Sequence, residues 1–267
     1  MDNIASISAK LIRATRASSK FTTMITLKKI ALITGANKGI GLETARQLGK
    51  QGITVVIGAR DESRGSAAVA QLKSEGLTAH FVSLDVTNPA SVTAAAASIE
   101  KDFGQLDILV NNAGVLDYGG EATPSTVPQE ILRSTFDLNF FGLISVTQAM
   151  LPLIRRSPAG RIVNLTSILG SIAEHADPNS PIFGAKFIAY DASKASVNMF
   201  TNHLAHELRD TPIKVNAAHP GWVKTDMGGP DAPMEIADGA KTSVMLATLP
   251  DSGPSGGFYH MGVHMRW

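Results

Sequence analysis

Apolar runs alternate with helix-like segments along the chain from Lys29 onward. The apolar runs are rich in Val, Ile and Leu and lack the polar alternation of half-exposed strands. This pattern is typical of parallel strands that helices cover on both faces. The predicted strands are 29–34, 53–58, 78–83, 106–110, 160–166, 213–218 and 257–260, and the predicted helices are 39–51, 63–75, 89–103, 128–154, 188–209 and a short one near 234–247.

The alternation of strand and helix predicts successive βαβ units with right-handed crossovers. The fold class is therefore α/β, a doubly wound Rossmann fold with a mostly parallel seven-stranded sheet and helices on both faces. The long loops at 115–127, 170–187 and 224–234 each follow a strand. We expect them over the carboxyl edge of the sheet, where ligands bind in such folds. No repeat or linker interrupts the pattern, so residues 24–267 are predicted to form a single domain.

Residues 1–23 differ in composition from the segment that follows them. They contain Ser, Thr and Arg, few acidic residues, and Ile4, Ile7 and Leu11 at helical spacing. Two interpretations stay open: a disordered leader or upstream start, with Met24 opening the domain, or an organelle transit peptide. We expect a cytoplasmic protein, or one in an organelle if residues 1–23 act as a targeting segment.

Composition narrows the class of partner. With 44% apolar and 18% charged residues the chain is globular in type, and no stretch reaches the roughly 20 uninterrupted apolar residues of a membrane helix. The chain has no cysteine, which excludes disulfides and cysteine metal ligands. The net charge of +1 hides a basic segment before Ile30 and a mildly acidic remainder, which argues against a nucleic-acid partner. Neither a membrane nor a nucleic-acid partner is therefore expected.

The first predicted strand ends in a glycine-rich turn, Thr34-Gly35-Ala36-Asn37-Lys38-Gly39-Ile40-Gly41, which opens directly into a helix. Glycines there allow a tight turn and a close approach of the backbone to a pyrophosphate, while the helix N-terminus offers free N–H groups. A tight turn without a ligand would also explain the glycines, and their spacing differs from the commoner Gly-x-Gly-x-x-Gly. The strand before and the helix after favour a dinucleotide site.

Further motifs follow in order: Asp85-Val86, Asn111-Asn112-Ala113-Gly114, Asn139, Ser167, Tyr190-Asp191-Ala192-Ser193-Lys194 and Pro220-Gly221-Trp222. Together with the glycine turn they resemble the short-chain dehydrogenase/reductase (SDR) family, and within it the carbonyl-reductase-like branch. The ending Gly256-Gly257-Phe258-Tyr259 also resembles the C-terminal strand of that branch. The resemblance implies a catalytic domain that moves a hydride between NADP(H) and the carbonyl or hydroxyl carbon of a small substrate.

A tyrosine beside a lysine suits this chemistry, because an ammonium stabilises phenolate and lowers a phenol pKa of about 10. Tyr190 and Lys194 lie at i and i+4 of a predicted helix and share one face, although such a pair alone is more typical of a solvated surface. The resemblance implies that Tyr190 is the general acid in reduction and that Lys194 lowers its pKa and holds the nicotinamide ribose. It also implies that Ser167 donates a hydrogen bond to the substrate oxygen and that Asn139 holds a water of the proton relay.

The resemblance implies the remaining cofactor contacts as well. Asp85 would take the adenine amino group and Val86 would flank the adenine ring, whereas Pro220 to Thr225 would surround the nicotinamide carboxamide. No metal ligand is expected. The predicted cofactor-binding residues are Gly35, Asn37, Lys38, Gly39, Ile40, Gly41, Arg60, Asp85, Val86, Asn112, Ala113, Gly114, Tyr190, Lys194, Pro220, Gly221, Val223 and Thr225.

The end of the second predicted strand favours NADP(H) over NAD(H). An NAD enzyme places an acidic side chain there to accept hydrogen bonds from the ribose 2′-hydroxyl, but the matching residue is Ala59. Arg60 follows it, and a guanidinium can bind a 2′-phosphate through two charge-assisted bonds. Lys38 adds a second positive charge from the glycine turn. The alternative for Arg60 is a surface ion pair with Asp61 or Glu62.

The segment from Ser171 to Ala189, called the insert below, is longer than the corresponding segment of many family members. It is expected to cap the substrate pocket and to crowd the helix that many relatives use to oligomerise. Monomer and homo-oligomer therefore stay undecided. Trp222 is expected at the mouth of the pocket.

Three functions stay open. The leading one is NADPH-dependent reduction of a ketone or aldehyde, and the second is oxidation of a secondary alcohol by the same residues. The third, a non-catalytic dinucleotide sensor or scaffold, is disfavoured because Tyr190 and Lys194 are both present. A metal site is set aside, because His203, His206 and Glu207 lack the His-Glu-x-x-His spacing of zinc proteases.

Overall fold

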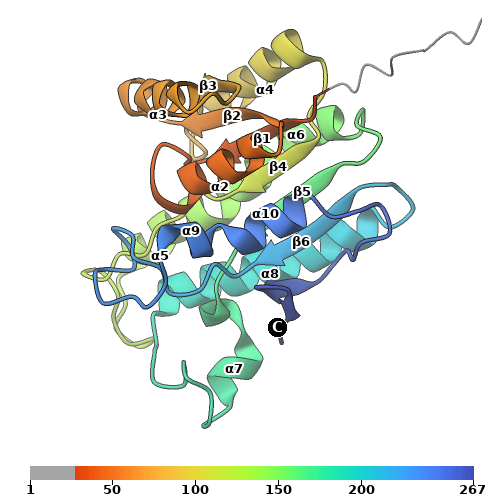
Figure 1. Ribbon diagram of the computed structural model, residues 1–267. Coiled ribbons are helices and arrows are strands. Elements are labelled where there is room, and N and C mark those ends of the chain that lie inside the picture. Colours follow the sequence, from red (N-terminus) through yellow and green to blue (C-terminus); the bar gives the residue numbers. More distant parts are fainter. Residues whose placement is uncertain (1–27) are drawn as a thin grey trace, which may run out of the picture.

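The computed structural model describes residues 28–267 and shows a twisted sheet between two layers of helices (Figure 1). The leader predicted at 1–23 and the domain start at Met24 lie outside the described residues. The strand order is β3-β2-β1-β4-β5-β6-β7-β8, and each pair is parallel except the last. The strands are β1 (Ile30–Thr34), β2 (Thr54–Ala59), β3 (Ala79–Ser83), β4 (Ile108–Asn111), β5 (Arg161–Leu165), β6 (Lys214–Ala218), β7 (Phe258–His260) and β8 (Val263–His264).

The predicted α/β doubly wound fold is confirmed, but the sheet has eight strands rather than seven. The added strand, β8, is two residues long and antiparallel to β7. The chain reverses between them at Met261 and Gly262, whose φ angles are 48° and 84°. Both residues of β8 are exposed, so no apolar run marks this strand in the sequence.

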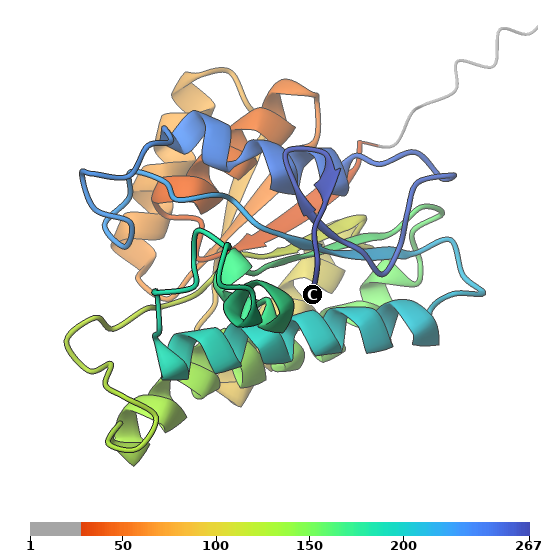
Figure 2. The same cartoon turned by 90° about the horizontal axis from the view of Figure 1, so that it is seen from below.

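Helices lie on both faces of the sheet (Figure 2). They bury two separate apolar clusters against it. Every residue of β1, β2, β4 and β5 is buried, which explains why the predicted strands read as unbroken apolar runs. One face is covered by α2 (Gly39–Lys50), α3 (Glu62–Ser74) and α10 (Lys241–Ala247), and the other by α4 (Pro89–Phe103), α6 (Gly142–Ile154) and α8 (Ile188–Glu207).

The order of the strands reverses beside β1, which lies between β2 and β4. Strands β2 and β3 extend the sheet on one side, and β4 to β8 extend it on the other. A crevice opens outside the carboxyl ends of the strands at such a reversal, and ligands bind there in doubly wound sheets. The three long loops follow β4, β5 and β6, so they lie at this edge as predicted.

Two predicted helices differ in detail from those observed. The helix predicted at 128–154 consists of α5 (Gln129–Phe136), a π-helical turn η1 (Asp137–Phe141) and α6. The helix predicted near 234–247 is divided into α9 (Ile236–Gly239) and α10. The insert contains a short helix, α7 (Ile172–Ala176). A π-turn adds a residue to the helical ladder without changing which residues are apolar, so the hydrophobic pattern does not reveal it.

Within residues 28–267, one helical stretch, Gln129–Ile154, is long and apolar enough to cross a membrane by length and composition, with a mean hydropathy of 1.3. In this structure it packs against α4, α8 and β4, and 44% of its most apolar window is buried. A core helix meets the same two criteria. The expectation that no membrane is a partner therefore stays a prediction.

Candidate active site

The glycine turn joins β1 to α2 at the point where the strand order reverses. Gly35 and Gly39 have φ angles of 63° and 57°, a region that residues with a side chain rarely adopt. A Cβ added at Gly41 would lie 2.5 Å from Nδ2 of Asn112. Lys38, the N-cap of α2, makes no side-chain cap bond, and the first turn carries no acidic residue. The first N–H groups of α2 are therefore left for an anion such as a pyrophosphate.

Hydrogen bonds join the residues after β4 to the glycine turn. Thr34 Oγ1 accepts the N–H groups of the two residues that follow the strand, at 3.0 Å each. The Asn112 amide donates to the Thr34 carbonyl at 2.8 Å. A Cβ on Gly114 would lie 3.4 Å from both Oδ1 of Asn139 and Nζ of Lys194. Asn112, Ala113 and Gly114, which are predicted to bind the cofactor, therefore lie between the glycine turn and two predicted catalytic residues.

Asp85 and Val86 follow β3 on the predicted adenine side. The Asp85 carboxylate uses one oxygen, Oδ1, to accept the N–H and the hydroxyl of Thr87, at 3.0 and 2.7 Å. Its other oxygen makes no hydrogen bond within residues 28–267 and is left for a donor such as an adenine amino group. Val86 is 9% exposed and packs against α6, where a Cβ on Gly142 would lie 2.9 Å from it.

Arg60 follows β2 at the same edge of the sheet, because Ala59 pairs with the last residue of β3. Its side chain is exposed, and it forms no ion pair with any residue that the structure describes. The nearby acid Asp61 caps α3 through the N–H of Arg64 at 2.9 Å and pairs with that guanidinium at 3.5 Å. The alternative of an ion pair between Arg60 and Asp61 or Glu62 is therefore wrong.

Lys38 binds a residue that the sequence did not suggest. Its Nζ lies 2.5 Å from the carboxylate of Asp226, which belongs to the loop after β6. The side chains are 62% and 81% exposed, so the pair is screened by solvent and contributes little stability. The pair joins the glycine turn to the loop predicted to surround the nicotinamide.

Ser167, Tyr190 and Lys194 converge beyond the carboxyl end of β5. Nζ of Lys194 lies 5.6 Å from the centroid of the Tyr190 ring and donates to the carbonyl of Leu165 at 3.0 Å. The Ser167 side chain lies beside the Tyr190 hydroxyl and acts to lower its pKa. Tyr190 and Lys194 are 8% and 4% exposed, so the predicted shared face of α8 is confirmed and the alternative of a solvated surface pair is wrong.

Burial determines the ionisation of both residues. It raises the pKa of Tyr190 well above the usual phenol value, and the Ser167 side chain opposes that rise. Burial also lowers the pKa of Lys194 to about 8. The net pKa of Tyr190 is therefore raised rather than lowered in this structure, and the phenol is protonated near neutral pH. The role of Lys194 in lowering that pKa stays a prediction. A protonated phenol is the form that a general acid requires.

Asn139 lies in the π-turn η1 and is fully buried. Its Oδ1 accepts the N–H of Val115 at 2.8 Å, and its Nδ2 donates to the Val115 carbonyl at 2.9 Å and to the Ser193 hydroxyl at 3.0 Å. Both amide protons are thus used, and the side chain ties the start of the 115–127 loop to α8. A relay water would have to bind an oxygen of Asn139, and that role stays a prediction.

A cavity of about 490 Å³ opens over Ser167 and Tyr190. The insert lines it, so the predicted capping of the pocket is confirmed. None of the described residues that line the cavity is Asp, Glu, Lys or Arg. The lining includes Leu116 and Tyr118 from the loop after β4, Pro181, Ile182, Ala185 and Phe187 from the insert, and Ile40, Pro220, Gly221, Trp222, Val223 and Thr225 from the predicted nicotinamide side.

His219, at the end of β6, also lines this cavity and is uncharged. Its Nδ1 accepts the N–H of Ile168 at 3.3 Å and that of Gly221 at 3.4 Å. Burial lowers the pKa of His219 to about 3, and the neighbouring His260 adds to the effect. The cavity therefore presents polar groups to a ligand but no full charge.

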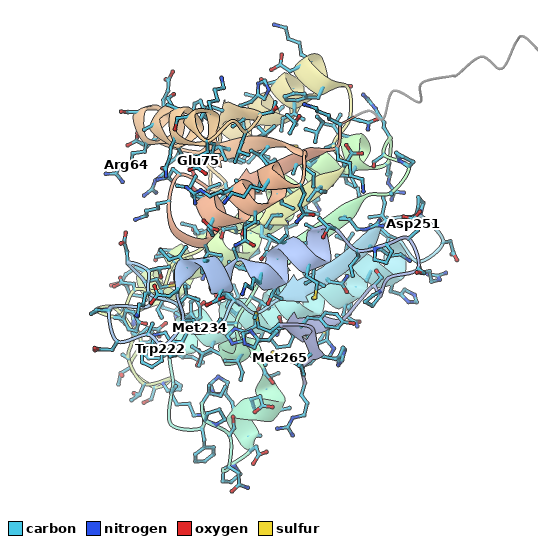
Figure 3. The ribbon with its side chains drawn as sticks, viewed as in Figure 1. Arg64, Glu75, Trp222, Met234, Asp251 and Met265 are labelled. Atoms are coloured by element: carbon cyan, nitrogen blue, oxygen red, sulfur yellow. The ribbon has the colours of Figure 1, made fainter. Side chains whose placement is uncertain are left out.

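Trp222 lies at the cavity mouth, as predicted, and is 56% exposed. Its indole N–H donates to the carbonyl of Gly228 at 2.8 Å, and its own carbonyl accepts the N–H of Met234 at 3.2 Å. Trp222 and Met234 lie at the same end of the molecule (Figure 3). These bonds fold the loop after β6 back onto itself beside the cavity.

Side chains of the insert contact both the end of the chain and α8. Arg266, near the end of the chain, binds Glu174 at 2.8 Å and Asp177 at 3.2 Å. His175 Nε2 lies 3.3 Å from the carboxylate of Asp191 in α8 and is hydrogen-bonded to the carbonyl of Leu169 at 2.9 Å. Burial lowers the pKa of His175. The insert is thereby fixed over the cavity.

The ionisation of Asp191 predicts a pH-dependent stability. Burial raises the pKa of Asp191 to about 7, and the negative charge of Glu121 adds to the rise. The hydrogen bond from the N–H of Phe187 and the positive charge of Lys186 oppose it. Because this value exceeds the unfolded value of about 3.9, the contribution of Asp191 to stability is complete below about pH 4 and is lost as the pH rises to about 7.

We expect Asp191→Asn to remove this dependence, so that the variant gains stability over the wild type as the pH rises from about 4 to about 7. Urea unfolding across this range measures the difference. A gain that is the same at every pH would contradict the assigned pKa.

Five residues of the site region were not predicted from the sequence: Glu121, Asp191, His219, Asp226 and Arg266. Asp191 and His219 each adjoin a motif residue, so an acid or an imidazole at those positions was a usable signal. Glu121 and Arg266 have no local signal, because their partners lie 69 and 92 residues away. Within the described chain, no three His, Asp or Glu side chains form a group that could hold a metal ion.

Known proteins share both the sequence and the fold. The model of the family described as short chain dehydrogenase matches residues 29–235. Carbonyl reductase 1 of Mus musculus, whose name specifies NADPH, is 36% identical over 281 residues, covering 88% of this chain and 97% of the mouse protein.

Two solved structures extend this likeness. Salutaridine reductase from Papaver somniferum has a TM-score of 0.76 and 31% identity, covering 87% of this chain and 99% of that one. The NADPH-bound carbonyl reductase from chicken fatty liver has a TM-score of 0.79 and 29% identity, covering 90% of this chain and 99% of that one. This chain belongs to the short chain dehydrogenase family, in the carbonyl-reductase-like branch.

Proposed function

We propose that the protein is an NADPH-dependent reductase that converts the carbonyl group of a small, uncharged ketone or aldehyde to an alcohol. One observation carries the proposal: Ser167, Tyr190 and Lys194 meet beside an uncharged cavity, next to the glycine turn. The similar carbonyl reductases are named or described with NADPH, which supports the same cofactor here.

The residues present fit such a dinucleotide. The uncapped N-terminus of α2 and the positive φ angles of Gly35 and Gly39 suit a pyrophosphate. Asp85 has a carboxylate oxygen for the adenine amino group, and Lys194 would hold the nicotinamide ribose. Val223 and Thr225, which line the cavity, would hold the carboxamide. When bound, the nicotinamide supplies the hydride.

The proton and the hydrogen bonds come from the protein. Reduction builds negative charge on the substrate oxygen, so donors are needed at that atom. Ser167 Oγ accepts the N–H of Leu169 at 3.1 Å, which leaves its hydroxyl proton for the substrate. Tyr190 transfers its phenolic proton to the same oxygen. The Lys194 ammonium then stabilises the buried phenolate, which would otherwise be costly.

The protonation state of Tyr190 suits reduction. Oxidation of a secondary alcohol would use the same residues, with Tyr190 acting as a base. The raised pKa of Tyr190 leaves the phenol as the acid that reduction needs near neutral pH, whereas the ratio of NADPH to NADP⁺ sets the net direction. A dinucleotide sensor would not require Tyr190, Ser167 and Lys194 together.

Assay of a panel of neutral ketones and aldehydes with NADPH, and of secondary alcohols with NADP⁺, tests this proposal. We expect turnover of carbonyl compounds, followed as loss of NADPH absorbance. A protein that binds NADPH and turns over neither set would be a sensor. Faster alcohol oxidation than carbonyl reduction at neutral pH would reverse the assigned direction.

The uncharged cavity predicts discrimination against charged substrates. We expect a keto ester to be reduced with a kcat/KM at least about tenfold above that of the matching keto acid, a difference of about 1.4 kcal/mol. The reason is that the cavity lining offers no Lys or Arg to compensate a buried carboxylate. Steady-state kinetics on the pair measure it, and equal values would contradict the uncharged cavity.

A further inference from the structure

The N-terminus of α8 is capped by a residue from a distant loop. Its N-cap residue, Phe187, makes no side-chain cap bond. Instead the Glu121 carboxylate accepts the N–H of Ala189 at 3.1 Å through Oε2 and the N–H of Tyr190 at 2.9 Å through Oε1. Each carboxylate oxygen thus satisfies one of the N–H groups that a helix leaves unpaired, at the end where its dipole favours a negative charge.

Glu121 belongs to the loop that forms one wall of the cavity. Leu116 and Tyr118 of the same loop line that cavity, and the Tyr118 ring packs edge-on against Phe187 with centroids 5.5 Å apart. The N–H of Glu121 donates to the carbonyl of Asp117 at 3.1 Å, which closes a turn and fixes the carboxylate relative to the wall. The two hydrogen bonds to α8 therefore join the substrate wall to the catalytic residue itself.

The position of the Tyr190 hydroxyl depends on its backbone. A tyrosine side chain rotates about only two bonds, so a shift or tilt of the first turn of α8 moves the hydroxyl relative to Ser167. Ser167 lies past the end of β5 and accepts the N–H of Leu169. Contacts that fix the first turn of α8 therefore help to keep the two hydroxyls in register.

We propose that Glu121 is a positioning residue for the reaction: its carboxylate holds the backbone of Tyr190 so that the phenol and Ser167 reach one substrate oxygen. This inference rests on the proposed role of Tyr190. In this structure each of the two N–H donors meets its own carboxylate oxygen. Glutamine has nearly the same shape but offers one oxygen, and its NH₂ group would face the second N–H.

Glu121→Gln tests the inference. We expect kcat per NADPH-binding site to fall between about 10- and 100-fold, the effect of a misplaced catalytic group, with NADPH affinity unchanged. The matched control is Glu130→Gln, at an exposed carboxylate near the start of α5, and it should retain wild-type kcat. If Glu121 only stabilised the fold, the melting temperature and the fraction of molecules that bind NADPH would fall while kcat per site stayed at the wild-type value. That result would overturn the inference.

Two further variants complete the test. Glu121→Asp keeps both oxygens on a side chain shorter by one methylene, so it should recover part of the kcat that Glu121→Gln loses; no recovery would argue against the carboxylate geometry. Tyr190→Phe, measured in parallel, separates this inference from the proposed function. An active Tyr190→Phe enzyme would refute the proposed chemistry, whereas an inactive one beside a fully active Glu121→Gln would refute only the positioning role.

Discussion

Tyr190→Phe is expected to lower turnover by a factor of about 10² or more, which is the usual effect of losing a general acid. The change removes the hydroxyl that lies beside Ser167 and leaves the ring in place beside Lys194. His219, which also lines the cavity, is neutral with a pKa of about 3 and offers no imidazolium proton. Single-turnover reduction of a carbonyl substrate with NADPH measures the chemical step directly.

Measuring NADPH binding by Tyr190→Phe distinguishes a loss of catalysis from a loss of folded protein. Because the phenyl ring preserves packing, the quenching or shift of NADPH fluorescence should be the same for Tyr190→Phe and the wild type. Tyr259→Phe removes a hydroxyl from a partly buried tyrosine in β7 that lies outside the cavity lining, and it should leave turnover unchanged. Near-normal turnover of Tyr190→Phe would refute the proposed mechanism.

The fold was predictable where buried elements appear in the sequence as apolar runs. Strands β1 and β2 are buried at every position, so they read as unbroken apolar runs, and α8 begins at Ile188 as predicted. The π-turn at Asp137–Phe141 was not predictable, because one added residue in a helical ladder leaves the apolar pattern nearly intact. The eighth strand was not predictable either, since its two residues are exposed.

In the candidate site, contacts between residues close in sequence were predictable, whereas contacts between distant residues were not. Tyr190 and Lys194 are four residues apart, so helical geometry alone places them on one face. Glu121 reaches α8 from 69 residues away, and no periodicity or spacing encodes that contact. The pKa of Tyr190 was predicted in the wrong direction, because burial is a property of the assembled fold and it outweighs what a neighbouring ammonium suggests in the sequence.

We expect the wild-type protein to prefer NADPH strongly to NADH. β2 ends at Ala59, which is 3% exposed and carries no acceptor for a ribose 2′-hydroxyl. The next residue, Arg60, is exposed, and it has no ion-pair partner within residues 28–267. Its guanidinium is therefore available to bind a 2′-phosphate through two parallel charge-assisted bonds.

Lys38 is a weaker candidate for the same phosphate. Its ammonium already pairs with Asp226 at 2.5 Å, which offsets part of the positive charge that it would offer a phosphate. An exposed ion pair is worth about 1 kcal/mol or less, so Lys38 is expected to add little net affinity. We expect Lys38→Ala to weaken NADPH binding less than Arg60→Ala does.

Arg60→Ala should weaken the binding of NADPH about 10- to 100-fold, the equivalent of one charge-assisted interaction of roughly 1.5–3 kcal/mol. The binding of NADH should be nearly unaffected. Arg64→Ala is the matched control, because Arg64 is an exposed arginine on α3 that pairs with Asp61 (Figure 3). Ala59→Asp should shift the preference toward NADH by adding a 2′-hydroxyl acceptor and repelling the phosphate. Because Ala59 is buried, that variant is compared by its ratio of kcat/KM for the two cofactors, which does not depend on how much protein is folded. Equal use of NADH and NADPH by the wild type, or an equal loss of both in Arg60→Ala, would show that Arg60 does not select the cofactor.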